Sequence, residues 1–398
     1  MMPKVARSPY GAAASIRLSP IDIRRITGSF EKEIAFLCSR TTIDVHLFEK
    51  INTLVQRVLD WDYVTSFANE HGIVYLLYYN LNRVVPNMMP QDVNQRLNLS
   101  CLARNFHLAA ALSNVMSLLS ANGIRAIPYK GPTFGAIIYK NPQSRIARDL
   151  DFLVHSRDYE KAQKVLLSAG YNAPIDFGWY KCHFWHPQQR VNIDLHRGLV
   201  PRWYRVNLKF DDLWKRCTKI TIGTGAIITT FCVEDLLFVL CLDLVKDIAE
   251  PSCLRLIKVV DIMELLKYTA ADIDWDTLIR RTERKGLSRI LYLGLLTADR
   301  LYGIDLPPHV RRSLGTERRL LKLADATIEL LFLDNYVHRV SKIKYAHELK
   351  TILAVRKGLK TKSVVCAYYL LKQGKVYSRE ALVCMKKRLG GAAGPERF

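Results

Sequence analysis

Two aspartates one residue apart, in the stretch RDLDFLVH at 148–155, are the first residues whose type and spacing could do chemistry. Successive side chains of a strand alternate between its faces, so Asp149 and Asp151 are predicted to project from one face, with Cα atoms about 6.6 Å apart. Two carboxylates held that close repel each other unless a cation lies between them. Carboxylate oxygens favour Mg²⁺, with Mn²⁺ as a substitute, and this spacing suits two ions about 3.5–4 Å apart. We therefore predict a two-ion metal site here.

A third acid lies in the stretch VNIDLHRG at 191–198, which alternates like a strand. Asn192, Asp194 and His196 are predicted to share one face of it. If this strand is a neighbour of the first, Asp194 becomes a third metal ligand and catalytic carboxylate, able to accept the proton of an incoming hydroxyl. His196 is expected to orient Asp194 or to pack beside it.

An anion site is indicated upstream, in the stretch YKGPTFG at 129–135. Gly131 follows a β-prone run, and Pro132 suits the first position of a helix. Backbone N–H groups at a helix start attract anions, and Lys130 adds a positive charge. Taken alone, a glycine-proline pair is more often an ordinary turn, so this stretch gains weight from the acids that follow it.

A second run with the same acid spacing shows that spacing alone decides nothing. Asp272, Asp274 and Asp276 stand in ADIDWDTLIRR. They precede a helix that one of them is expected to cap, and no glycine follows at the position that a calcium loop requires. These three acids are therefore predicted to be structural.

The elements that must position the acids predict an α+β fold, with a small mixed sheet and its helices between two helical regions. Apolar residues recur at helical spacing before and after the middle of the chain, whereas the middle contains the strand-like runs. The predicted parts are a basic, disordered tail at 1–28, a helical region at 29–120, an α/β core at 121–230, a helical region at 231–310 and a basic helical tail at 311–398.

Composition limits the class of protein. No apolar run approaches the roughly 18–20 residues that span a bilayer, so a cytoplasmic protein without membrane contact is expected. The nine cysteines include no CxxC pair, which favours reduced thiols. A zinc site is disfavoured, because the spacing of the candidate ligands matches no standard pattern; these ligands would be Cys182, His183, His186 and His196.

Positive charge is concentrated at the C-terminal end. The formal net charge is +22, and residues 311–398 contain 20 Lys and Arg against 7 Asp and Glu. Such a region attracts phosphates, nucleic acid or an acidic partner. A polyanion is therefore a possible partner of this tail, although a solvated Lys-rich helix would have the same composition.

The order of these motifs resembles a known superfamily. The sequence has KG, then RxxxDxD with an apolar continuation, then an amphipathic helix ending in GY, and then IDLH. This order is similar to that of the DNA polymerase β-like nucleotidyltransferases, and more closely to a bacterial family of mostly uncharacterised nucleotidyltransferases. The resemblance extends upstream through LDWDYVTSFANEHGIVYLLYYNL and downstream to about residue 303, and the region after 310 takes no part in it.

The resemblance implies roles for individual residues. Asp149 and Asp151 would be the metal pair, with Asp194 as the third carboxylate. Gly131 would mark the turn beside the phosphates, and Thr133 would replace the serine that usually follows the glycine. The remaining nucleotide-binding residues would be Lys130, Arg145 and Lys246.

The sequence departs from the family pattern on either side of Lys246. Asp243 and Asp247 stand where histidines are expected. The chemistry of the nucleotide pocket at this point therefore differs from that of the relatives, whereas the three acids of the predicted metal site are present.

The function implied is Mg²⁺-dependent transfer of a nucleoside monophosphate, most simply AMP from ATP, with release of pyrophosphate. The acceptor would be a hydroxyl or phosphate of a small molecule, peptide or protein. Two alternatives stay open: a metal-dependent glycosyltransferase of the DxD type, and a non-catalytic protein that binds nucleic acid or another partner through its basic C-terminal region.

Overall fold

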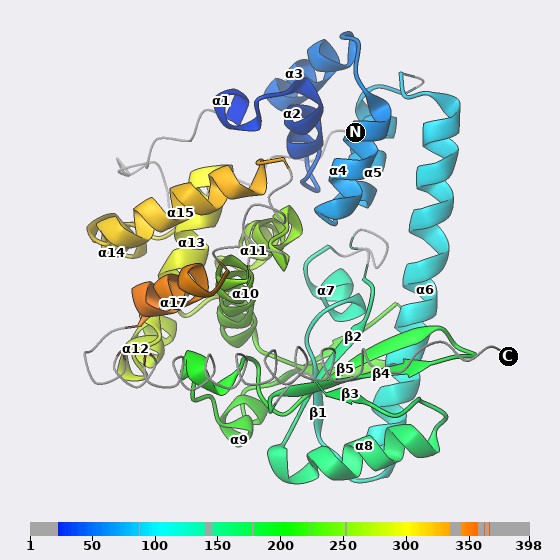
Figure 1. Ribbon diagram of the computed structural model, residues 1–398, viewed down its shortest axis with the longest axis vertical. Helices are drawn as coiled ribbons and strands as arrows, with labels where there is room; N and C mark the ends of the chain where they lie inside the picture. Colours follow the sequence, from blue (N-terminus) through cyan, green and yellow to red (C-terminus); the bar gives the residue numbers. More distant parts are fainter. Residues whose placement is uncertain are drawn as a thin grey trace, which may run out of the picture.

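In the computed structural model, a helical part and a sheet part lie side by side, and one long helix runs from the first to the second (Figure 1). The structure describes residues 23–86, 88–139, 145, 147–176, 179–223, 225–250, 253–334, 344–356, 362 and 366. The predicted basic tails at 1–28 and 311–398 therefore lie largely outside the described residues.

The described part of the chain starts with five short helices, and the long helix α6 follows them. Three of them start at a capping side chain that accepts a backbone N–H: Ser29, Asp44 and Asp60, as helix starts require. These helices are α1 (Ile23–Thr27), α2 (Phe30–Leu37), α3 (Val45–Val55), α4 (Trp61–Glu70), α5 (Val74–Val84) and α6 (Gln91–Ala121).

A five-stranded mixed sheet follows, in the order β1-β2-β5-β4-β3. The central pair, β2 and β5, is parallel, and the other neighbours are antiparallel. Every residue of β2 is buried, as expected for a strand with apolar side chains on both faces. The strands are β1 (Ala126–Pro128), β2 (Leu150–Val154), β3 (Ile175–Asp176), β4 (Lys181–His186) and β5 (Val191–His196).

Short helices and a separate hairpin complete the sheet part. The hairpin pairs β6 with β7, with Thr218 opposite Thr230. Helix α6 packs on the sheet through its C-terminal half, which shares a buried cluster with β2, β4 and β5. The additional elements are α7 (Pro132–Ile137), η2 (Ser156–Asp158), α8 (Tyr159–Ser168), η3 (Arg202–Tyr204), α9 (Phe210–Trp214), β6 (Thr218–Thr221) and β7 (Ile227–Thr230).

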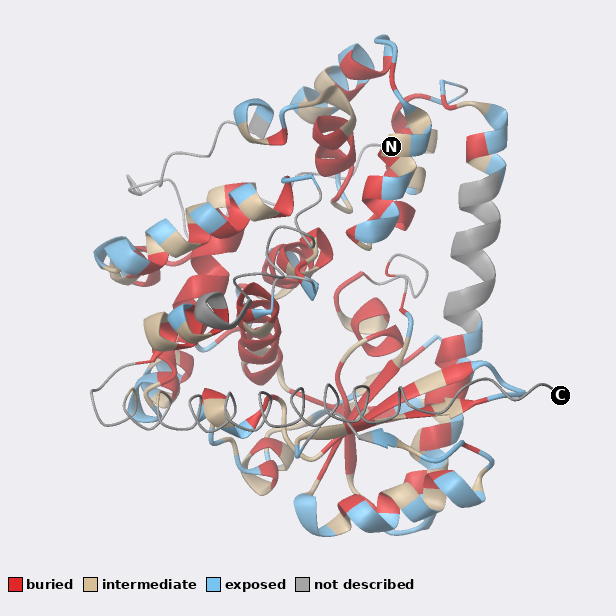
Figure 2. Cartoon of the chain, viewed as in Figure 1, coloured by how far each residue is buried: buried red, intermediate tan, exposed pale blue. Residues whose placement is uncertain are grey.

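The C-terminal helices form the larger core together with α2–α5. Helix α10 is buried on nearly all sides (Figure 2), because most of its residues are apolar and its buried acids have cationic partners. It crosses α13 where Gly294 leaves room for Cys241; a Cβ at Gly294 would overlap that side chain. These helices are α10 (Val233–Ala249), α11 (Leu256–Thr269), α12 (Trp275–Arg284), α13 (Ser288–Tyr302), α14 (Pro308–Thr316), α15 (Arg318–Leu331) and α17 (Lys344–Val355).

The predicted fold class is confirmed: a mostly helical α+β protein with a small mixed sheet between helical regions. Asp274 accepts the backbone N–H of Thr277 at the start of α12, so the second acid run caps a helix as predicted.

In the described part of the chain, no helix is long and apolar enough to cross a membrane. The boundaries between the predicted domains stay predictions.

Candidate metal and nucleotide site

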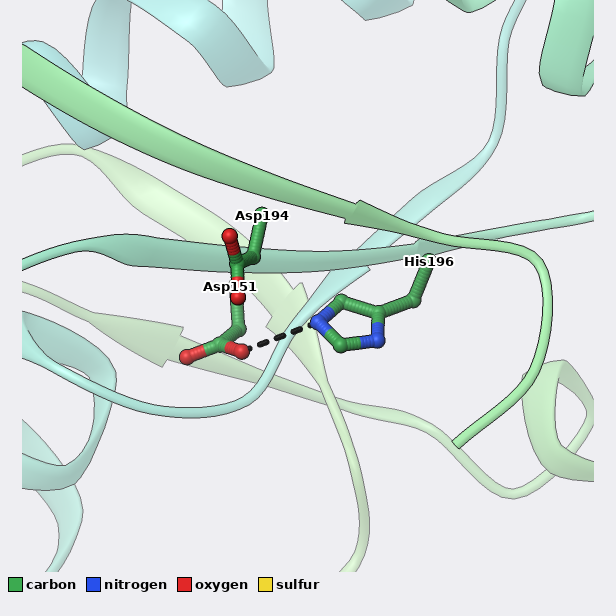
Figure 3. A group of neighbouring side chains, drawn as sticks. All are labelled: Asp151, Asp194 and His196. Atoms are coloured by element: carbon green, nitrogen blue, oxygen red, sulfur yellow. Dashed lines mark hydrogen bonds and ion pairs between the residues drawn. The ribbon is translucent and has the colours of Figure 1, made fainter. Parts of the chain in front are cut away.

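The register of the two central strands brings two of the predicted acids together. β2 and β5 are parallel, and Asp151 lies directly opposite Asp194. Both are buried, at 4% and 5% exposure. Figure 3 shows their side chains pointing to the same side of the sheet, with His196 beside them. The expectation that the strand of Asp194 is a neighbour of the strand of Asp151 is therefore confirmed.

His196 contacts a different aspartate from the one expected. Its Nε2 lies 3.0 Å from Asp151 Oδ1, across the strand boundary (Figure 3). Of the two expected roles, His196 does not hold Asp194 by a hydrogen bond, because it lies opposite Leu153 and its ring reaches diagonally to the neighbouring strand. It does pack beside Asp194, since a ligand atom of each lies within 4.8 Å of the other. Its other nitrogen, Nδ1, is buried and has no hydrogen-bond partner in the described structure.

Two residues of β4 hold Asp194 instead. His183 lies directly opposite Asp194, and its Nδ1 is 2.9 Å from Asp194 Oδ1. Lys181, two residues earlier on the same face, forms an ion pair with Asp194 Oδ2. Burial and the charge of Asp151 oppose ionisation of Asp194, but Lys181 and His196 outweigh them and lower its pKa. Asp194 is therefore a carboxylate at neutral pH.

Sequence reasoning missed Lys181 as a site residue and considered His183 only for a zinc site, which it disfavoured. The signal was present, because the stretch KCHFWH alternates polar and apolar residues and so places Lys181 and His183 on one face. Cys182 faces the other way, where its sulfur accepts a hydrogen bond from Gln163 on α8. Among the described residues, the group able to hold a metal ion is Asp151, Asp194 and His196, with one ligand atom of each within 4.8 Å of the others.

Asp149 lies in the bend just before β2, rather than on the strand itself. No described residue forms a hydrogen bond or ion pair with its side chain. Burial raises its pKa to about 6, and the charges of Asp151 and Asp194 act in the same direction. Asp149 is therefore a third carboxylate under repulsion from the other two, and a cation among the three would relieve that repulsion.

The turn before α7 approaches these acids from β1. Gly131 has a φ of +58°, and an added Cβ there would lie 3.2 Å from the backbone oxygen of Asp149, so glycine permits both the conformation and the close approach. Lys130 Nζ lies 3.6 Å from Asp151 Oδ1. The Thr133 hydroxyl is buried and has no hydrogen-bond partner in the described structure; an orphaned buried hydroxyl at this place fits a ligand that accepts or donates one hydrogen bond.

A cluster of lysines lies between this turn and the helices α10 and α11. Lys130 Nζ is 3.0 Å and Lys246 Nζ 2.8 Å from Asp243 Oδ1, and Lys258 pairs with the other oxygen of the same carboxylate. Asp247 lies 3.4 Å from Lys258. Burial opposes ionisation of Asp243, but the three lysines outweigh it and hold its pKa well below its usual range.

The two aspartates that depart from the family pattern thus hold lysines. We name Lys130, Lys246 and Lys258 the lysine cluster. The three ammonium groups share Asp243 and Asp247, and Lys130 also pairs with Asp151, so the cluster is joined to the acids of the sheet through Lys130. Lys258 was not identified from the sequence; the weak signal was a single basic residue in the otherwise apolar start of α11.

Arg145 is not brought together with the acids of the sheet. It is buried at 8% exposure, and its Nε lies 2.9 Å from both oxygens of Asp261 on α11. Asp261 also accepts a hydrogen bond from the Tyr139 hydroxyl at 2.8 Å. The contacts of Arg145 in the structure are therefore those of an internal anchor.

Divalent cations fit this group of residues. Two buried carboxylates, Asp151 and Asp194, meet there, and Asp149, with its raised pKa, is repelled by both. Hard oxygen ligands of this kind suit Mg²⁺ or Mn²⁺. The lysine cluster beside them adds the positive charge that a polyphosphate requires. The site can accordingly hold cations and a polyanion next to each other.

Comparison with known proteins agrees with this chemistry. The model of a family described as uncharacterised nucleotidyltransferases matches residues 58–303. One solved structure that resembles the chain is an antigenic nucleotidyltransferase-like protein from Paracoccidioides brasiliensis, with 16% sequence identity, 47% of this chain and 93% of that chain covered, and a TM-score of 0.32. No curated protein matches in sequence. The matched region contains the sheet, the three acids and the lysine cluster, and the chain therefore belongs to this nucleotidyltransferase family.

Proposed function

We propose that the protein is a Mg²⁺-dependent nucleotidyltransferase of the polymerase β type, moving AMP from ATP to a hydroxyl or phosphate of an acceptor. The acceptor would be a small molecule, a peptide or a protein. The observation that carries the proposal is the direct pairing of Asp151 with Asp194 on parallel strands, beside a half-buried lysine cluster. Family membership supports the same reaction class.

Asp149, Asp151 and Asp194 would hold the metal, with Mg²⁺ or Mn²⁺ as the ion. Bound ions of this kind neutralise phosphate charge and lower the pKa of an acceptor hydroxyl. His196 donates to Asp151 and keeps that carboxylate turned toward Asp194. His183 and Lys181 fix Asp194 in the same way from β4, and such supporting contacts hold a site in its working geometry.

The lysine cluster would bind the triphosphate. Phosphoryl transfer is catalysed mainly by positioning and charge neutralisation. Lys130 and Lys246 both lie beside Asp243, and Lys130 also lies 3.6 Å from Asp151. Gly131 would let the backbone approach the phosphates, and the Thr133 hydroxyl would donate to one of them. A contact of Arg145 with the triphosphate is still only a prediction. In the structure, the charge of Arg145 is matched by Asp261.

The transfer itself needs no covalent intermediate. A bond would form between the acceptor oxygen and the α-phosphorus, while the bond from the α-phosphorus to the bridging oxygen breaks and pyrophosphate leaves. The acceptor proton would pass to a carboxylate oxygen of Asp194, which is ionised at neutral pH.

The test is binding and turnover in matched variants. We expect ATP to raise the melting temperature of the wild type only with Mg²⁺, and this shift to be absent in Asp149→Asn/Asp151→Asn. The control is Asp272→Asn/Asp276→Asn, which removes the same two charges at exposed positions around the α12 cap and should keep the shift. If Asp149→Asn/Asp151→Asn still releases pyrophosphate from ATP at the rate of the wild type, the proposal is contradicted. Stabilisation by nucleotide-sugars in preference to all four nucleoside triphosphates would instead identify a glycosyltransferase.

A further inference from the structure

A group of arginines begins where the catalytic strand β5 ends. Arg197 follows His196 directly, and Arg202 and Arg205 belong to the turn of η3 a few residues later. The segment from 195 to 210 contains four basic residues and no acid. This concentration of charge leads away from the metal site along the chain.

Trp179 holds two of these arginines side by side. The guanidinium of Arg202 lies 3.9 Å and that of Arg197 5.2 Å from the centroid of the indole ring. Arg197 Nε also donates to the Trp179 backbone oxygen. Trp179 is 38% exposed, so part of the indole stays accessible beside the stacked guanidinium groups. Stacking leaves the N–H edges of a guanidinium free to bind phosphate.

Helix α17 adds a fourth arginine from the basic C-terminal region. Arg356, just after α17, donates from Nη2 to the backbone oxygen of Arg205 at 3.2 Å. It is 5% exposed, yet its Nε and Nη1 have no hydrogen-bond partner in the described structure. The helix is held here by Trp203, whose indole N–H donates to Glu348 at 3.0 Å. A buried guanidinium with two unsatisfied nitrogens is costly unless an anion completes it.

The arginines of this group differ from several others in the described part of the chain. Arg125, Arg216 and Arg300 each form an ion pair with an aspartate. In contrast, Arg197, Arg202, Arg205 and Arg356 form no ion pair with an acid within the described part of the chain. We name these four arginines, together with Trp179, the arginine–tryptophan surface.

We propose that the arginine–tryptophan surface binds single-stranded nucleic acid and delivers its terminal hydroxyl to Asp194 as the acceptor. This inference rests on the proposed function for the acceptor role, but not for binding. Four guanidinium groups exceed what a single phosphate requires, since one or two suffice for that. An exposed indole next to arginines is the combination that stacks bases and follows a phosphate backbone. An acidic protein would use the charges but not the indole plane.

The surface adjoins, along β4 and β5, the residues that hold Asp194. Tyr180 separates Trp179 from Lys181, and Lys181 pairs with Asp194. The backbone oxygen of Tyr180 accepts the N–H of Arg197. Trp179 is therefore two residues along the chain from Lys181, which contacts the predicted catalytic acid Asp194. The end of a nucleic acid bound at Trp179 would lie near that acid.

The experiment measures the affinity of a labelled single-stranded oligonucleotide of about 12 residues, a length within the range that such surfaces cover, by fluorescence anisotropy over a series of salt concentrations. Arg202→Gln/Arg205→Gln should weaken binding at least tenfold. It should also make the salt dependence shallower by about 1.4, because each single-strand phosphate contact contributes about 0.7. Trp179→Ala should weaken binding about tenfold with little change in that slope.

The control is Arg318→Gln/Arg319→Gln, which removes the same charge from exposed positions on α15 and should change affinity less than twofold. Retained binding in the Arg202/Arg205 variant, or an equal loss in the control, would overturn the proposal. Competition by poly-glutamate as effective as that by the oligonucleotide would also overturn it and point to an acidic protein. The Mg²⁺-dependent ATP shift should be intact in the Arg202/Arg205 variant, so failure here is distinct from failure of the proposed nucleotidyl transfer.

Discussion

Two buried aspartates on successive helices, Asp243 on α10 and Asp261 on α11, differ in the number and kind of cations that surround them. Asp261 is fully buried and receives one guanidinium on both oxygens, together with the hydroxyl of Tyr139. Asp243 lies among three lysines, Lys130, Lys246 and Lys258. Asp247, one turn later on α10, also pairs with Lys258. The first group is complete within the protein, whereas the second shares one of its lysines, Lys130, with Asp151 of the candidate metal site.

The difference separates an anchor from a binding group. A buried pair that is satisfied internally holds elements in place, and removal of one partner leaves a buried charge uncompensated. A lysine cluster that shares its charge with the acids of a metal site is suited to an anionic ligand when cations neutralise those acids. Substitutions in the Asp261 group should therefore change stability, and substitutions in the lysine cluster should change nucleotide binding.

The largest effect is expected for Asp261→Asn. The substitution leaves the buried guanidinium of Arg145 without a counter-charge, which costs about 3–5 kcal/mol of the free energy of unfolding. Urea denaturation measures this loss. In the control Asp325→Asn, the partner of Arg300 is more exposed and the loss should stay below about 1 kcal/mol. A loss below about 1 kcal/mol in Asp261→Asn as well would remove the distinction between the two aspartates.

His71, which contacts the start of α11, should make stability depend on pH. His71 Nδ1 accepts the backbone N–H of Leu256 at 3.2 Å. Burial, with the charges of Arg255 and Lys32, lowers the pKa of His71 from 6.5 to about 4. The unfolded chain therefore binds a proton more readily than the folded chain between these values. Stability should fall as the pH falls from about 6.5 to about 4, by up to about 3 kcal/mol.

The measurement for His71 is urea denaturation at several pH values between 4 and 7. His71→Gln, which cannot take up a proton, should lose the part of the pH dependence that the wild type shows in this interval. The variant should also be less stable than the wild type at pH 7 if glutamine fails to accept the Leu256 N–H. An identical pH dependence in both proteins would show that His71 titrates normally.

A smaller effect, of a different kind, is expected for Lys258→Gln. Removal of one cation from the lysine cluster should weaken Mg²⁺-dependent ATP binding about 10- to 100-fold, because a hydrogen bond to a charged group contributes about 1.5–3 kcal/mol. Stability should change by less than about 1 kcal/mol, since Lys130 and Lys246 still neutralise Asp243. Titration calorimetry and urea denaturation measure the two quantities. Lost stability with unchanged affinity would make this cluster an anchor like that of Asp261.

The sequence predicted the fold class and the meeting of Asp151 with Asp194, because both follow from short-range alternation and one assumption about neighbouring strands. It did not predict the partners of Asp243 or Arg145. Lys130 and Asp243 are 113 residues apart, and Arg145 and Asp261 116. Such pairs depend on how two helices pack against the sheet, which no local pattern encodes. His196 illustrates the same limit at short range, since its partner depends on the parallel register of β2 and β5.

The smallest effect is expected for Lys267→Gln, which sharpens the comparison because this lysine also lies on α11. Lys267 Nζ lies 3.5 Å from Glu264 and donates to the hydroxyls of Thr41 and Thr42. Glu264 keeps the backbone N–H and hydroxyl of Thr41 as partners without it, so the loss should be about 0.5–1 kcal/mol. ATP affinity should not change. A tenfold loss of affinity in this variant would mean that charge anywhere on α11 affects nucleotide binding through the general field of the helix. The effect of Lys258 would then be no evidence for direct contact with a phosphate.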